Sequence, residues 1–95
     1  MTAYAILDVE IHDIEPYMRY MVSVKPLIEQ FGGRYLVRGG EFKVIEGEYQ
    51  PARIVLLEFP DLDAIEGFYQ SAGYCSLKAL RESCSTTSMT VVQGC

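Results

Sequence analysis

The chain has 95 residues, of which 49% are hydrophobic and 12% aromatic, and its 13 acidic residues outnumber its 8 basic ones. This size predicts one domain, residues 1–95, that buries roughly 60–65% of its unfolded surface, so its core is modest and contact with a partner subunit would extend it. The acidic balance argues against binding nucleic acid or anionic lipid. With no apolar run of about 18 residues and no basic leader, the chain is expected in the cytoplasm.

The first predicted element is a strand, AYAILDVEIH at residues 3–12, which alternates in polarity and is rich in β-forming residues. One of its faces is purely apolar. The opposite face begins apolar and becomes acidic, and it carries Tyr4, Ile6, Asp8, Glu10 and His12.

A helix is expected next, over residues 13–33, because apolar side chains recur there every three or four positions. Asp13 suits its N-terminal cap, and Gly32 or Gly33 suits a left-handed end. Pro26 lies inside the pattern, where its missing N–H and its ring predict a kink or a break near Val24.

The middle of the chain predicts two strands joined by an extension. Residues 33–40, GRYLVRGG, form the first of them, and residues 41–53 form a small extension with a turn near Gly47. Residues 53–60, RIVLLEFP, are almost continuously apolar, which favours a central strand covered on both sides.

A second helical region is expected over residues 61–83, capped by Asp61 and interrupted near Ser71-Ala72-Gly73. A last strand follows over residues 86–94, TTSMTVVQG. The resulting order, β-α-β-β-α-β, predicts a ferredoxin-like α+β fold in which both helical regions cover one face of a four-stranded antiparallel sheet.

The other face of this sheet would be bare and partly apolar, which favours association of two copies. Burial of apolar area contributes roughly 25 cal/mol per Å², so several hundred Å² contributes many kcal/mol before the cost of association is subtracted. A homodimer is therefore the predicted assembly.

Three runs of the sequence resemble one known group of proteins: residues 3–21, AYAILDVEIHDIEPYMRYM; residues 32–40, GGRYLVRGG; and residues 55–74, VLLEFPDLDAIEGFYQSAGY. They are similar to the short bacterial proteins of domain-of-unknown-function family thirteen-thirty, and the resemblance covers nearly the whole chain. It implies a dimeric α+β barrel, a superfamily that includes cofactor-free monooxygenases and isomerases such as muconolactone isomerase. It implies no settled activity. His12 stands where the family commonly has threonine, so a role for it would be particular to this protein.

Charged residues of three neighbouring strands are expected on the sheet face away from the helices. In the strand order 4-1-3-2, Asp8, Glu58 and Arg38 lie on adjacent strands, and the Arg38 fork could bind both carboxylates. A register error of one residue would exchange the two faces. Two interpretations are open: a polar network that only closes the dimer, or a pocket in which a carboxylate of raised pKa acts as a base.

Other candidate residues have both a structural and a functional interpretation. His12 is either a surface or capping residue or a general base at the pocket rim. Asp8, Glu10 and His12 could hold a divalent metal only weakly, so no metal and no cofactor are predicted. Tyr69 and Tyr74 flank the helix interruption as core or rim aromatics, or they donate hydrogen bonds to a ligand.

The leading hypothesis is a homodimeric barrel that binds a small organic molecule between sheet and helices. It could act as a cofactor-independent oxygenase or isomerase: Arg38 would hold an anionic or enolate oxygen while Asp8, Glu58 or His12 moves a proton. The alternative is a non-catalytic binding or structural dimer whose interior charges only stabilise assembly.

Overall fold

Four strands and three helices build the protein as one sheet covered on one side. The computed structural model describes residues 1–95, and its elements are β1 (Ala3–Ile11), α1 (Ile14–Gln30), β2 (Arg34–Arg38), β3 (Ile54–Phe59), α2 (Leu62–Gln70), α3 (Ala72–Cys84) and β4 (Ser85–Gln93). The strand order is β2-β3-β1-β4, and all neighbours are antiparallel. The predicted ferredoxin-like α+β fold is confirmed.

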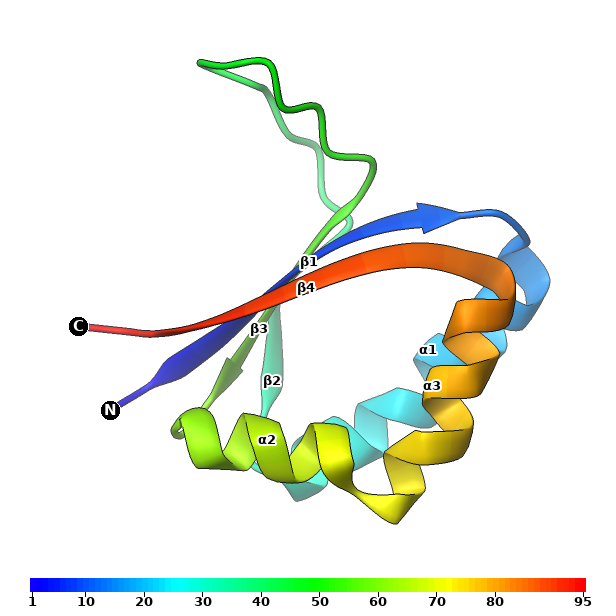
Figure 1. Cartoon of the computed structure of the whole chain (residues 1–95), viewed down its shortest axis with the longest axis vertical. Helices are drawn as coiled ribbons and strands as arrows, with labels where there is room; N and C mark the ends of the chain where they lie inside the picture. The colour runs from blue at the N-terminus through cyan, green and yellow to red at the C-terminus, as the bar shows by residue number, and fades with distance from the viewer.

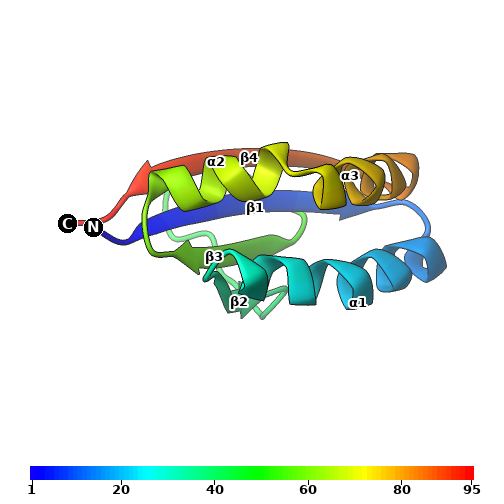
Figure 2. The same ribbon diagram turned by 90° about the horizontal axis from the view of Figure 1, so that it is seen from below.

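The three helices lie on one side of the sheet, and the loop between β2 and β3 extends away from them (Figure 1). Seen from the helix side, α1 runs over the β2–β3 half of the sheet, and α2 and α3 run over the β1–β4 half (Figure 2). We call the helix-covered face the inner face and the other the outer face. None of the three helices is long and apolar enough to cross a membrane.

Alternation along the two central strands fills the inner face with apolar side chains, as predicted. β1 pairs with β3 so that Leu7 lies opposite Val55 and Ala5 opposite Leu57. These residues are buried together with Phe59, which is only 1% exposed. Because strand residues alternate between faces, Asp8 and Glu58 lie on the outer face.

Helix α1 begins and ends close to its predicted limits. Asp13 occupies the N-cap position in an extended conformation, although its side chain accepts no capping hydrogen bond. Gly32 has φ +81° and ends the helix, as predicted. Of the two outcomes predicted for Pro26, a kink or a break near Val24, the break does not occur, because α1 continues through Pro26 without interruption. Pro26 lies on the exposed side, where water can bond the carbonyl group that lacks a helical donor.

The second helical region is divided where the sequence predicts. Asp61 caps α2 by accepting a hydrogen bond from the Ala64 amide at 2.8 Å. Ser71 then ends α2 with an extended backbone, and its hydroxyl accepts from the Tyr74 amide at 3.2 Å to start α3. One residue therefore acts as C-cap and N-cap, which sets the direction in which Tyr74 enters the interior.

Strand β2 contains a β-bulge that changes which side chains face the helices. Arg34 pairs with Glu58 and Tyr35 with Leu57, but beyond the bulge Val37 pairs with Leu56 and Arg38 with Val55. Directly paired residues lie on the same face, so Arg38 shares the inner face with Val55, and Val37 lies on the outer face. The prediction that Arg38 faces outward beside Asp8 is wrong, because one extra residue reverses the alternation.

The segment from residue 39 to residue 53 forms the projecting loop, with Gly47 at φ +93° in its predicted turn. Asp8 holds the base of this loop. Its carboxylate accepts hydrogen bonds from the Tyr49 hydroxyl, the Ala52 amide at 2.9 Å and the Arg53 amide at 3.3 Å. The loop therefore enters β3 at a defined position.

Candidate functional site

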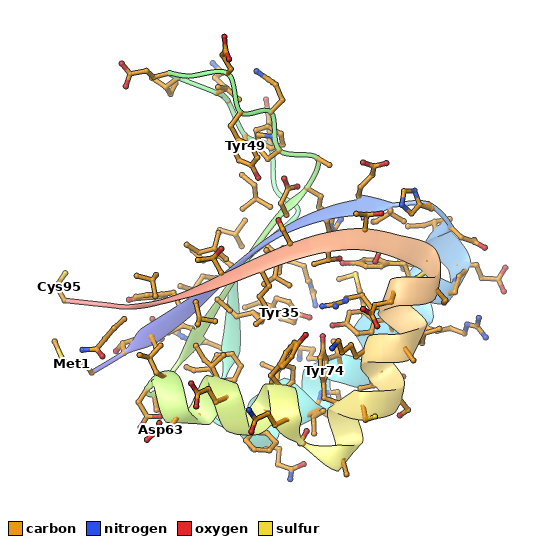
Figure 3. All side chains as sticks on the ribbon, in the orientation of Figure 1. Met1, Tyr35, Tyr49, Asp63, Tyr74 and Cys95 are labelled. Atoms are coloured by element: carbon orange, nitrogen blue, oxygen red, sulfur yellow. The ribbon has the colours of Figure 1, made fainter.

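Tyrosine and arginine side chains gather in the space between the sheet and the helices. Figure 3 shows Tyr35 projecting from β2 and Tyr74 from α3 into this space. We call the group the tyrosine–arginine cluster; its members are Tyr17, Tyr20, Tyr35, Tyr74, Arg38, Arg53 and Arg81.

The deep end of the cluster contains a buried charge. Arg81 is 6% exposed, and its Nη1 donates to the Tyr74 hydroxyl at 3.2 Å. The Tyr74 and Tyr20 hydroxyls are 2.9 Å apart and share a further hydrogen bond. The buried Nε of Arg81 has no acceptor, and no carboxylate forms an ion pair with this guanidinium. A buried charge without a partner costs several kcal/mol, so this position favours a bound anion or polar oxygen.

The outer end of the cluster holds two further arginines against aromatic rings. The Arg53 guanidinium carbon lies 5.8 Å from the Tyr17 ring centre, and Arg38 lies 4.7 Å from that of Tyr35. Arg53 donates weakly to the Met21 sulfur at 3.7 Å, and its buried Nε has no acceptor. Neither arginine forms an ion pair.

Two adjoining spaces surround these side chains. An inner cavity of about 20 Å³, room for about one water molecule, is lined by Tyr20, Tyr35, Tyr74 and Arg81 among others. An open groove of about 430 Å³ runs beside α1 and is lined by Arg38 and Arg53. Tyr17 and Met21 line both spaces, so they separate them. No aspartate, glutamate or histidine lines either one.

Burial determines the ionisation of the phenols. Desolvation raises the pKa values of Tyr17, Tyr20 and Tyr35 above the ordinary tyrosine value, despite the opposing effect of nearby arginines. These phenols are therefore protonated near neutral pH and act as hydrogen-bond donors. Together with the guanidinium groups, they can stabilise a negatively charged oxygen, but they offer no base of ordinary strength.

The two tyrosines predicted as ligand-binding residues have different surroundings. Tyr74 is buried in the cluster, with its ring centre 5.5 Å from that of Tyr69. Tyr69 is 37% exposed, carries the Lys78 ammonium 4.9 Å from its ring centre, and lines a separate open pocket between α2 and β4. Only Tyr74 therefore lies beside the inner cavity.

The pKa of Asp8 is shifted in the opposite direction from the one expected of a general base. The hydrogen bond from Tyr49, with help from the Ala52 and Arg53 amides, lowers the pKa of Asp8 below its ordinary value. The prediction of a raised pKa is therefore wrong for this carboxylate. Because Asp8 accepts from the Arg53 backbone, it positions an arginine of the cluster from the other face of the sheet.

The remaining outer-face candidates are bound to their neighbours. Glu58 accepts from Arg34 at 2.8 Å, so Arg34 takes the compensating role predicted for Arg38. His12 Nε2 lies 2.7 Å from the Thr86 hydroxyl, and its Nδ1 lies 3.7 Å from Glu10. Asp8, Glu10 and His12 form no cluster able to hold a metal ion. A role of His12, Asp8 or Glu58 in proton transfer stays a prediction.

Sequence reasoning missed several members of the cluster. Tyr17 and Tyr20 fall within the apolar period of the helix predicted over residues 13–33, and Arg53 lies where the predicted extension meets the next strand. Arg81 carried a usable signal, since it follows Tyr74 by seven residues, two helical turns along one face, with Cys84 three residues further on. A cation inside a buried stripe indicates a specific partner or a binding site.

The fold and the buried cluster define a ferredoxin-like α+β protein with a polar interior site. The chain belongs to the family described as Domain of unknown function (DUF1330), whose sequence model matches residues 2–95. No curated protein matches the chain.

Solved structures share this fold at low sequence identity. A protein of unknown function from Rhodopseudomonas palustris has a TM-score of 0.81 and 14% identity, over 99% of this chain and 82% of that one. A dimeric ferredoxin-like protein of unknown function from Jannaschia sp. CCS1 has a TM-score of 0.73 and 11% identity, over 99% and 100%. SnoaB, a cofactor-independent oxygenase from Streptomyces nogalater, has a TM-score of 0.58 and 11% identity, over 98% and 92%. At such low identities these similarities show a common fold, and they do not show that this chain shares the activity of any of these proteins.

Proposed function

We propose that this protein is a homodimer that binds a small organic molecule between the sheet and the helices, at the tyrosine–arginine cluster. The observation that carries the proposal is the buried guanidinium of Arg81, whose Nε lacks an acceptor. An oxygen atom of a ligand would accept from it and from the neighbouring phenols. The binding would recover part of the desolvation cost of the charge.

The two adjoining spaces support a route to this position. A molecule in the groove beside α1 is separated from the cavity by the side chains of Tyr17 and Met21. Methionine is unbranched and adapts easily to different shapes, so Met21 can move aside at low cost. The cavity without ligand is small, and widening it requires a shift of such side chains rather than of the sheet.

Native mass spectrometry of protein purified directly from cells tests the proposal. We expect a bound small molecule on the wild-type protein and its loss from Arg81→Met, which keeps the buried volume but removes the charge. Arg34→Met is the matched control, since it removes the same charge from the outer face and should retain the molecule. Equal occupancy of the wild-type protein and Arg81→Met would contradict the proposal, and so would the absence of any bound molecule from the wild-type protein.

A second candidate function is cofactor-independent oxygenase or isomerase chemistry. It is favoured by the likeness in fold to SnoaB and by the donors that converge on the cavity, which suit a developing enolate oxygen. Because no carboxylate or imidazole lines the cavity, the substrate would have to enter already ionised. Incubating the identified molecule with the protein tests this function. A product that differs from the molecule in mass, as after oxygenation, or in chromatographic retention at equal mass, as after isomerisation, and that requires Tyr74 favours catalysis. Recovery of the molecule unchanged in both favours the non-catalytic alternative.

We propose that two copies associate through the outer faces of their sheets, because this face carries exposed apolar side chains. Ile6 is 44% exposed there, in the centre of the strand, and its neighbours include Tyr4, Ile54, Leu56 and Val92. The Jannaschia protein of the same fold is dimeric. Sedimentation velocity at micromolar concentration should give a dimer, and Ile6→Lys should shift it towards the monomer because a charge would be buried. A wild-type monomer under these conditions would contradict the assembly.

A further inference from the structure

We infer that the groove beside α1 is a binding site for an organic anion with an apolar body, such as an aromatic or aliphatic carboxylate. Arg38 and Arg53 would bind the carboxylate, and side chains of α1 would contact the apolar part. This inference rests on the proposed function, because the groove shares Tyr17 and Met21 with the inner cavity, and it names the class of molecule that this site accepts.

The charge of the groove is opposite to that of the whole protein. The chain has a formal net charge of −5, but the groove is lined by Lys25, Arg38 and Arg53 and by no acidic residue. Lys25 has a surface partner, Glu29, at 3.6 Å. The two arginines have none, so they remain available to a ligand. Such a local positive field attracts anions and not cations.

Arg53 is held in place before any ligand arrives. Asp8 on the outer face accepts from the amides of Ala52 and Arg53, and Tyr49 donates to the same carboxylate. On the other side, a Cβ atom at Gly39 would lie 2.5 Å from the Arg53 guanidinium, and Gly39 has φ +72°. The positive φ favours glycine at this position, and a side chain there would displace the guanidinium that packs against it. A fixed donor with an unoccupied, buried Nε is suited to binding, because little side-chain entropy is lost.

Arg38 reaches the same groove because of the bulge in β2. The bulge turns Arg38 to the inner face, where it stacks on Tyr35 and lines the groove together with Arg53. A guanidinium group presents a planar fork of donors that matches the two oxygens of a carboxylate. Two such groups in one groove without a carboxylate from the protein itself favour a carboxylate from a ligand.

The opposite wall of the groove is apolar and accessible. Val22 is 74% exposed, and Ile14 and Met18 are exposed beside it on α1. A bare phosphate ion would make no use of this wall. The volume of about 430 Å³ lies in the range of small-molecule sites, so the groove fits an amphipathic anion rather than an inorganic one.

Isothermal titration calorimetry with 2-naphthoate and its neutral analogue 2-naphthamide tests this inference on the full chain. We expect the wild-type protein to bind the carboxylate about tenfold or more tightly than the amide, the effect of one charge-assisted hydrogen bond. Arg38→Gln and Arg53→Gln should each weaken naphthoate roughly tenfold or more and leave naphthamide unchanged. Lys43→Gln is the matched control, since it removes a unit charge from the projecting loop and should leave both affinities unchanged.

A further variant separates loss of binding from loss of folding. Val22→Glu changes an exposed residue, so it should retain the wild-type melting temperature while weakening naphthoate by repulsion. Equal binding of the two compounds, no effect of the arginine substitutions, or no binding of either compound at millimolar concentration would overturn the inference. Those results would leave the proposed function standing if Arg81→Met still removed the cellular ligand. Retention of that ligand by Arg81→Met would instead contradict the proposed function.

Discussion

The two faces of the sheet use charged residues in different ways. On the outer face, Arg34 is 2.8 Å from Glu58, and Asp8 accepts three hydrogen bonds from the projecting loop. On the inner face, Arg38, Arg53 and Arg81 have no carboxylate partner, and two of them carry a buried Nε without an acceptor. The residue type is the same on both faces, but only one face leaves its positive charges uncompensated.

Under the proposed function, this difference separates charges that serve the fold from charges that would serve a ligand. The outer arginine is neutralised within the chain and requires nothing further. Among the inner arginines, Arg53 and Arg81 each keep a buried Nε without an acceptor, which costs free energy and is expected where a protein reserves donors for a bound molecule. Unpaired buried cations are therefore a stronger indication of a site than the polar network predicted from the sequence.

The largest expected effect is a difference in stability loss between truncating an inner-face side chain and truncating an outer-face side chain. Phe59→Ala removes a fully buried inner-face ring, so we expect a loss of about 3–5 kcal/mol in the free energy of unfolding. Ile6→Ala on the outer face should cost about 1 kcal/mol or less in dilute protein and more as dimers form. Urea denaturation at several protein concentrations measures both. Similar losses in dilute solution would contradict the assignment of a single apolar core to the inner face.

A smaller change in the free energy of unfolding, a gain rather than a loss, is expected when the buried arginine of the inner face is replaced. Arg81→Met should raise the free energy of unfolding of the ligand-free protein by roughly 1–4 kcal/mol, because an uncompensated buried charge is replaced by an apolar chain. Tyr74 would keep its hydrogen bond to Tyr20. Arg34→Met on the outer face should change stability by less than about 1 kcal/mol. Thermal and urea unfolding test the contrast, and strong destabilisation by Arg81→Met would mean that the guanidinium is compensated in the fold.

The smallest expected effect is on the pH dependence of stability. It involves Asp8, which holds the projecting loop where the loop joins the sheet. The pKa of Asp8 is lowered in the folded protein, so its contribution to stability is present above the unfolded value of about 3.9 and is lost as pH falls through the lower folded value. Melting temperatures between about pH 5 and pH 2 should therefore fall less steeply in Asp8→Asn than in the wild-type protein. Glu10→Gln, a neighbouring outer-face substitution, is the control. Parallel curves for the wild-type protein and Asp8→Asn would contradict the role given to this carboxylate.

Local patterns in the sequence were sufficient for the order and limits of most elements. The alternation of residues 3–12 predicted β1 and both of its faces. The three-to-four-residue period predicted α1 and its end at Gly32, and the polar Ser71 marked the division between α2 and α3. These signals are local, since the period of side chains along a strand or helix is set by its own backbone geometry.

The tertiary structure alone decided which charged residues meet. The face on which Arg38 lies depends on how β2 pairs with β3, and a bulge in that pairing moved Arg38 from the outer to the inner face. Arg53 and Arg81 come from segments distant in sequence, and only folding brings both towards the tyrosines without a carboxylate beside them. Hydrogen bonding between strands and packing between helices are non-local, so no period within one segment reveals them.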